Sequence, residues 1–194
     1  MFPRRGRPPG TSARELELVA LRLFTDQGFD ETTVEQIAAG AGVSRRTFFR
    51  YFDTKASVLW HTFDREVGAL NSGFDATSHD VGLMDAIRLV VVGVNHYRAE
   101  DVPELRMRIN LIGTVPALQA SSAPHYDAWE RAVSTFAGRR LGLPADTLLP
   151  LAIGRTTLAA CRAAFDVWVA QADADLTVYL DEALSALTRG FAAA

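Results

Sequence analysis

The chain has 194 residues, of which 48% are hydrophobic and 22% charged, and its formal net charge is −3. These proportions exclude an intrinsically disordered protein, and the net charge gives no hint of a nucleic-acid partner. No apolar run approaches the roughly 18 uninterrupted residues of a membrane span, and the single cysteine, Cys161, excludes an internal disulfide framework. We expect a folded cytoplasmic protein with no membrane segment, in which Cys161 is a small buried side chain rather than a reactive thiol.

Residues 1–10 are rich in Arg, Pro and Gly, which predicts a flexible basic arm. Basic arms beside helix-turn-helix domains contact the minor groove or the backbone of DNA. Arg4, Arg5 and Arg7 are therefore candidate DNA contacts if such a domain follows. The alternative is a solvated tail without a partner.

Two capping patterns predict the first two helices. Ser12 with Glu15, and Thr33 with Gln36, both have the spacing of a capping box at a helix start. Apolar residues repeat at helical intervals after each pattern. Gly28 is placed to end the first helix.

A short glycine-containing turn separates the second helix from a third. Gly40 and Gly42 end the second helix, and Ser44 is placed to cap the next one, which we expect to span 44–52. Phe48 and Phe52 are four residues apart, so they share one helix face and are expected in the core rather than stacked on bases. Residues 11–54 thus form a three-helix domain.

Three short helices with a tight turn before the last are typical of a helix-turn-helix DNA-binding domain. Its third helix enters the major groove N-terminus first, so Arg45, Arg46 and Thr47 are expected to meet base edges. Arginine can bond guanine O6 and N7 together, and the threonine methyl can touch thymine. The remaining candidate DNA contacts, mostly to phosphates, are Thr33, Ser44, Phe49, Arg50, Tyr51 and Lys55.

The rest of the chain, 55–194, is predicted to be a helical bundle. We expect a connecting helix over about 55–71, a loop over 72–82 and a helix over 83–98. Prolines then divide further helices at roughly 104–113, 117–139, 146–171 and 175–191. No β-alternation of useful length appears, so the fold class is all-α: an N-terminal three-helix helix-turn-helix domain followed by a ligand-binding and dimerisation bundle.

Aromatic and polar side chains of the bundle are candidates for the wall of a small-molecule site. They are Trp60, His96, Met107, Asn110, Trp129, Phe136, Phe165 and Trp168. Each apolar member has the alternative of core packing. Arg106 and Arg108 suit a carboxylate or phosphate, but residues two apart face different sides of a helix, so at most one should point inward. The four histidines lack the spacing of a metal site, and we expect neither a metal nor a cofactor.

The last two helices are rich in small residues, which allow helices to approach closely. These are Ala152, Gly154, Ala159, Ala160, Ala163, Ala164, Ala183, Ala186 and Gly190. We expect them to form an isologous four-helix interface between two subunits. The alternative is close packing within one subunit.

The segment LFTDQGFDETTVEQIAAGAGVSRRTFFRYFDTKASVL, residues 23–59, resembles the N-terminal domain of TetR-family regulators. The match includes an aromatic at Phe29, the pair Thr32 and Thr33, and an aromatic-x-Tyr-Phe-x-x-Lys ending over 49–55. The resemblance implies a homodimeric repressor in which each subunit binds half of a palindromic operator. It also implies a small-molecule ligand in the C-terminal domain that releases the DNA.

Two features refine this resemblance. Many relatives have a small residue in place of Arg46 and a histidine or similar residue in place of Arg50, which leaves the operator sequence open. The segments RRTFFRYF, NLIGTVPALQA and YDAWERAV are similar to TetR-type regulators associated with mycofactocin gene clusters, which implies a ligand such as an acyl-CoA.

The sequence leaves alternatives to a ligand-released repressor. An effector-free DNA-binding dimer and an activator are the alternatives that keep the DNA-binding head. No nucleophile elbow, phosphate-binding loop or paired-carboxylate cluster supports an enzyme, so we expect no catalytic residues.

Overall fold

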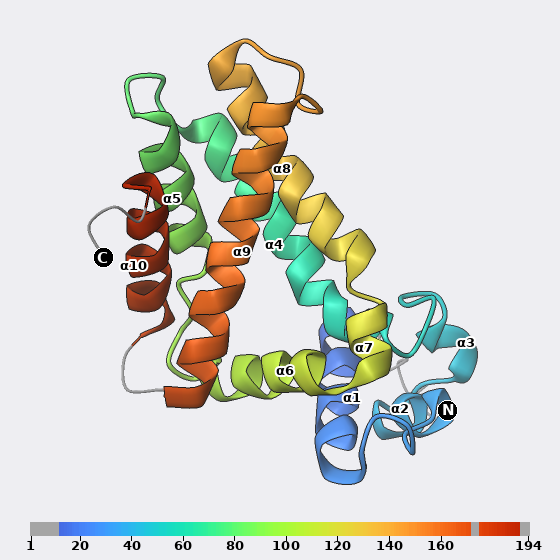
Figure 1. Cartoon of the computed structure of the whole chain (residues 1–194). Coiled ribbons are helices and arrows are strands. Elements are labelled where there is room, and N and C mark those ends of the chain that lie inside the picture. The colour runs from blue at the N-terminus through green and yellow to red at the C-terminus, as the bar shows by residue number, and fades with distance from the viewer. Residues whose placement is uncertain (1–11, 172–174, 191–194) are drawn as a thin grey trace, which may run out of the picture. The chain divides into compact units, whose positions relative to one another are not determined.

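The computed structural model describes residues 12–171 and 175–190, and all regular secondary structure in those ranges is α-helical (Figure 1). The predicted all-α fold class is confirmed. The chain divides into two compact units, Met1–His61 and Thr62–Ala194. This division lies inside α4 (Ser57–Ala76), shortly after the predicted boundary at 54 and 55. The arm arginines Arg4, Arg5 and Arg7 lie outside the described residues.

The first unit contains α1 (Ala13–Gln27), α2 (Val34–Gly40), α3 (Arg45–Phe48) and the start of α4. Both predicted capping boxes are formed. The Ser12 hydroxyl accepts from the Glu15 backbone N–H at 3.2 Å, and the Glu15 carboxylate accepts from the Ser12 N–H at 2.9 Å. The same reciprocal pair joins Thr33 and Gln36, at 3.2 and 2.7 Å. These local bonds satisfy N–H groups that a helix start leaves unpaired.

The third helix is shorter than expected, because α-helical geometry ends at Phe48 rather than at residue 52. The chain then tightens, with the N–H of Tyr51 bonded to the carbonyl of Phe48 at 2.9 Å. Phe48 and Phe52 still share the buried side, with ring centroids 5.6 Å apart. Their predicted place in the core is therefore correct.

The second unit contains the rest of α4 followed by six helices. These are α5 (Leu83–Val94), α6 (Val102–Thr114), α7 (Pro116–Ala120), α8 (Ala123–Leu141), α9 (Leu148–Gln171) and α10 (Leu176–Thr188). The long helix α9 packs along both α8 and α10 (Figure 1). Of the helices in the described ranges, α9 alone is long and apolar enough to cross a membrane, a test that core helices of soluble proteins also pass.

Several helix ends differ from the predictions. The connecting helix continues to Ala76 instead of giving way to a loop at residue 72, and α5 ends at Val94 rather than at residue 98. The helix expected over 117–139 is two helices. Ser121 and Ser122 each turn a hydroxyl back onto a carbonyl of α7, and Pro124 occupies the first turn of α8, where its missing N–H costs nothing.

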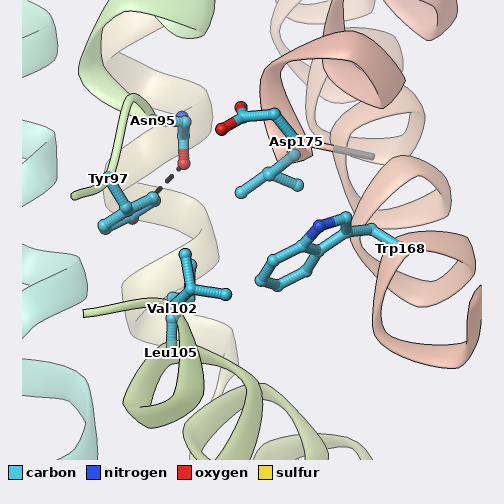
Figure 2. Close-up of a pocket in the computed structure, with 7 residues that line it drawn as sticks. Asn95, Tyr97, Val102, Leu105, Trp168 and Asp175 are labelled. Atoms are coloured by element: carbon cyan, nitrogen blue, oxygen red, sulfur yellow. Dashed lines mark hydrogen bonds between the residues drawn. The ribbon is translucent and has the colours of Figure 1, made fainter. Parts of the chain in front are cut away.

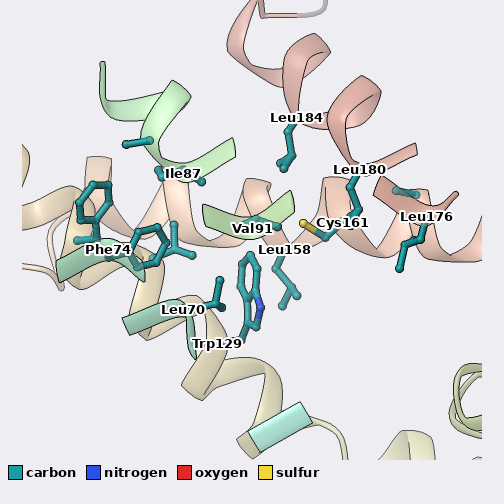
Figure 3. Close-up of a cluster of buried hydrophobic side chains, with 14 of the residues drawn as sticks. Leu70, Phe74, Ile87, Val91, Trp129, Leu158, Cys161, Leu176, Leu180 and Leu184 are labelled. Atoms are coloured by element: carbon teal, nitrogen blue, oxygen red, sulfur yellow. The ribbon is translucent and has the colours of Figure 1, made fainter. Parts of the chain in front are cut away.

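The core of the second unit is a cluster of apolar side chains from α4, α5, α6, α8, α9 and α10, most of which Figure 3 draws. Leu70, Val91, Trp129 and Leu180 illustrate how each helix contributes one buried face. Cys161 lies in this cluster with 3% of its surface exposed, as expected for a small core residue. Burial raises the pKa of its thiol to about 12, so the thiolate is not formed at neutral pH.

The small residues of α9 face two ways. Gly154 and Ala164 are buried within the unit, whereas Ala152, Ala159 and Ala163 are exposed. At Gly154 a Cβ atom would lie 2.7 Å from the carbonyl oxygen of Glu130 on α8, so only glycine fits there. Close packing within the subunit therefore accounts for some of the small residues. The exposed alanines remain candidates for the predicted interface between subunits.

Candidate DNA-binding surface and effector pocket

The first turn of α3 faces solvent. Ser44 is its N-cap, and its hydroxyl accepts from the N–H of Thr47 at 3.1 Å. Ser44, Arg45 and Arg46 are exposed, and Thr47 is half-buried with its hydroxyl 3.0 Å from that of Ser44. The polar groups predicted to meet bases are thus available to a partner.

The two adjacent arginines have different surroundings. Nε of Arg45 lies 2.9 Å from a carboxylate oxygen of Glu35, and its guanidinium sits 5.1 Å from the ring centre of Phe49. Arg46 has no hydrogen bond or ion pair to any other described residue. Arg45 is therefore held in place, while Arg46 is free to turn.

Lys55 points into the first unit. Its ammonium donates to the backbone carbonyls of Phe29 at 2.6 Å, Thr32 at 2.8 Å and Asp30 at 3.4 Å. It also lies 4.2 Å from the centre of the Phe29 ring. An ammonium has three donors, and three carbonyls surround this one. In this structure Lys55 holds together the connection between α1 and α2, and its contact with a DNA phosphate stays a prediction.

The other candidate DNA contacts are at the surface. Thr33 caps α2, and Phe49 and Tyr51 are 41% and 37% exposed. The Arg50 guanidinium donates to the Tyr51 hydroxyl at 3.0 Å and lies over its ring. Their contact with DNA stays a prediction.

The second unit contains a small pocket, bounded by residues of α6, α9, α10 and the segment after α5 (Figure 2). It is lined by Asn95, Tyr97, Val102, Leu105, Trp168, Asp175 and Leu176. Its volume is ≈ 50 Å³. Sites for drug-sized ligands start at about 300 Å³, so this pocket does not accommodate such a molecule in the form described.

The polar wall of the pocket is connected to α4. The Tyr97 hydroxyl donates to the carboxylate of Glu66 on α4 and lies 3.5 Å from the side-chain oxygen of Asn95. Burial raises the pKa of Tyr97 far above its usual value, and the charge of Glu66 adds to that effect. Tyr97 therefore stays protonated and remains a donor at any physiological pH.

The charged residues near the pocket each have a hydrogen-bond or ion-pair partner within the protein. Hydrogen bonds from Thr177 lower the pKa of Asp175, which is thus an ionised carboxylate on the pocket wall. Arg108 is buried and bonded to Glu104 at 2.6 Å. Arg106 donates to the carbonyl of Val169 at 2.6 Å and lies over Trp168. Of the two arginines, only Arg108 is fully buried.

The structure brings together few of the predicted ligand contacts. Only Trp168 lines the pocket. Trp129 and Phe136 belong to the core cluster, and Phe165 packs against it. The remaining four are Trp60, which is buried in the first unit, the exposed His96 and Asn110, and the half-buried Met107.

Comparison with known proteins follows the same two-part division. Residues 18–60 match the model of the family described as bacterial regulatory proteins, tetR family, and residues 81–192 match that of the MftR C-terminal domain. The chain belongs to the TetR family. The predicted resemblance is therefore confirmed, and this TetR-family chain is a DNA-binding transcriptional regulator.

Individual TetR-family relatives agree with this assignment. The Mycobacterium tuberculosis protein MftR, named for transcriptional regulation of mycofactocin biosynthesis, is 29% identical over 185 residues, covering 95% of this chain and 93% of that protein. The transcriptional regulator EthR of Mycolicibacterium smegmatis is 39% identical over 74 residues, covering 37% of this chain and 34% of its own.

Solved TetR-like structures share the fold. Thermus thermophilus FadR in complex with lauroyl-CoA has a TM-score of 0.63 at 22% identity, over 94% of this chain and 96% of that one. Bacillus subtilis FadR in complex with stearoyl-CoA has a TM-score of 0.63 at 14% identity, over 92% and 99% of the chains. At these identities the similarity establishes architecture alone.

Proposed function

We propose that this regulator is a homodimeric repressor that binds a palindromic operator through the first turn of α3 and is released by a small molecule bound in its second unit. The observation that carries the proposal is the exposed polar turn Ser44–Thr47 at the start of α3, a helix that packs on the first unit. A helix N-terminus with arginines and hydroxyls suits the donor and acceptor pattern of the major groove.

Dimerisation through α9 and α10 is supported by an exposed face of small and apolar residues. Ala152, Ala159 and Ala163 lie on one exposed side of α9, which continues to Val167, and Val178 is exposed on α10. Such a face allows two helix pairs to pack closely as an isologous interface. The dimer must then hold its two α3 helices about 34 Å apart, or a multiple of that, to reach successive major-groove faces.

The proposed effector is a long apolar chain with an anionic head, such as an acyl-CoA. This choice is supported by the acyl-CoA complexes of two proteins that share the fold. The pocket walls are mainly apolar, and Asp175 would repel an anionic group. The acyl chain would therefore enter, and the phosphates would stay outside.

Release would follow from the small size of the pocket. A pocket of ≈ 50 Å³ excludes an acyl chain, so the ligand selects a form with parted helices. A ligand that binds one form better shifts the population toward it by its differential affinity. The helix α4 carries residues of both units and contacts the pocket wall through Glu66, so it is the expected route of the signal.

Three measurements on the full chain test this proposal. We expect a dimer by light scattering, recovery of a palindrome from a random pool of duplex DNA, and at least a fivefold loss of operator affinity with saturating lauroyl-CoA or stearoyl-CoA, the lower end of usual allosteric coupling. A monomer indifferent to DNA would overturn the proposal.

An effector-free DNA-binding dimer is the second candidate, and the small volume of the pocket described above favours it. It predicts operator binding that no acyl-CoA or other apolar anion changes. Transcription from the operator, measured with and without the protein, separates a repressor from an activator.

The Tyr97→Phe variant tests the route through α4. The change removes the hydroxyl that donates to Glu66 but keeps the ring in the pocket wall. We expect effector binding to persist, while the effector's influence on operator affinity falls by about 5-fold or more, because coupling of 1–3 kcal/mol passes through such contacts. Calorimetry of acyl-CoA binding and anisotropy of labelled operator measure the two quantities. The control is Tyr179→Phe on α10, and equal coupling in all three proteins would contradict the prediction.

A further inference from the structure

We propose that Glu35 is a specificity-determining positioning residue, which together with Phe49 holds Arg45 so that its two terminal nitrogens face a guanine in the operator half-site. The inference rests on the proposed function, in which the first turn of α3 meets the bases. It adds a residue of α2 that is not itself expected to touch DNA.

Two neighbours restrict the guanidinium of Arg45. Nε lies 2.9 Å from a carboxylate oxygen of Glu35, and Cζ lies 5.1 Å from the ring centre of Phe49. The three residues come from three points of the motif: the first turn of α2, the first residue of α3 and the C-cap of α3. A planar group bonded at one edge and placed over a ring on one face samples fewer orientations than an unrestrained one.

The guanidinium nitrogens of Arg45 that Glu35 does not contact match the acceptors of guanine. A guanidinium has five N–H donors, and the bidentate contact to guanine O6 and N7 uses two of them. Because Glu35 occupies Nε, the two Nη groups at the far end of the fork remain for a base. An arginine held in this way loses less side-chain entropy when it binds DNA than a freely rotating one does.

The carboxylate of Glu35 opposes a general attraction of this surface to DNA phosphates. Its side chain is 61% exposed beside that of Arg45, which is 65% exposed, so it puts a negative charge next to the cation expected to meet the DNA. This charge weakens sequence-independent binding, which depends on neutralising phosphates. An exposed ion pair also contributes little to folding stability. Positioning of Arg45 explains the pair better than attraction to phosphate or stability does.

The test uses the full chain and an operator selected from random DNA. Each guanine of the half-site is replaced in turn by 7-deazaguanine, which lacks the N7 acceptor. For the wild type we expect one position where this replacement weakens binding by about 5- to 150-fold, the range of one bidentate contact. In Glu35→Ala, which removes both the charge and the acceptor for Nε, we expect that penalty to fall below about threefold, while affinity for random duplex DNA rises.

Two matched variants isolate the effect. Glu31→Ala removes the same side chain from another exposed position of the first unit and should keep the full penalty. Arg45→Lys keeps the charge but lacks the planar fork, so it should lose the penalty. Unchanged thermal unfolding of Glu35→Ala, together with loss of the penalty, excludes a folding defect.

The possible results distinguish a failure of the positioning role from a failure of the proposed function. A full penalty in Glu35→Ala, or the same loss in Glu31→Ala, overturns the positioning role while the proposed function stands. No penalty at any guanine for the wild type overturns base reading by Arg45, and the positioning role with it. A wild type that selects no sequence at all refutes the proposed function itself.

Discussion

Replacing Lys55 with Met is expected to lower the unfolding free energy of the first unit by about 3 kcal/mol, since hydrogen bonds to a charged donor are worth roughly 1.5–3 kcal/mol each and some carbonyls regain water. The methionine keeps most of the buried stem but leaves the carbonyls of Phe29, Asp30 and Thr32 without their donor. Hydrogen exchange of the amides in 12–61 measures the change, because it reports on this unit separately from the second.

The salt dependence of DNA binding distinguishes this structural role from a phosphate contact. Loss of one phosphate contact reduces the slope of log K against log salt by about 1 without changing hydrogen exchange. We expect that behaviour from Arg50→Met, an exposed cation of the same unit, and not from Lys55→Met. If Lys55→Met changed the slope and left amide protection intact, the role assigned to Lys55 here would be wrong.

The parts of the first unit that the sequence predicts well are those decided within a few residues. The capping boxes at Ser12 and Thr33 depend on a partner three positions away, and both are formed. The core positions of Phe48 and Phe52 follow from their spacing of four. Local bonds and helical periodicity are enough for these features.

Contacts between distant residues account for what the sequence does not predict. Lys55 binds carbonyls 23 to 26 positions earlier, and Glu35 meets Arg45 across a turn, neither of which any short motif specifies. The pocket joins segments near 95–105, 168 and 175. Among the lining residues that the sequence analysis missed, Asn95 has a signal of its own, because a polar residue directly after a strongly apolar helix indicates a helix end that faces a cavity or a partner.

The aromatic residues of the bundle show why composition alone does not locate a ligand site. Trp129 and Trp168 are both buried, at 5% and 2% exposure, yet only Trp168 lines the pocket. Trp129 lies among Leu70, Val91 and Leu158 in the core cluster (Figure 3). A large apolar side chain has the same sequence signature in either place, and only the packing of the helices around it decides its role.

Trp129→Ala is therefore expected to cost about 4 kcal/mol of stability in the second unit, within the range for a large aromatic side chain removed from a core. The core cluster would lose its large side chain from α8, and a cavity would remain. Urea unfolding followed by hydrogen exchange in 62–190 measures this loss in protein without ligand.

A ligand-contacting role for Trp129 makes the opposite prediction. Without effector, Trp129→Ala would then be close to wild type in stability, and only the stabilisation that an acyl-CoA adds would disappear. Asn110→Ala is the control, because an exposed residue away from the core changes stability by no more than about 0.5 kcal/mol. A Trp129→Ala protein as stable as the Asn110→Ala protein would remove Trp129 from the core and return it to the effector site.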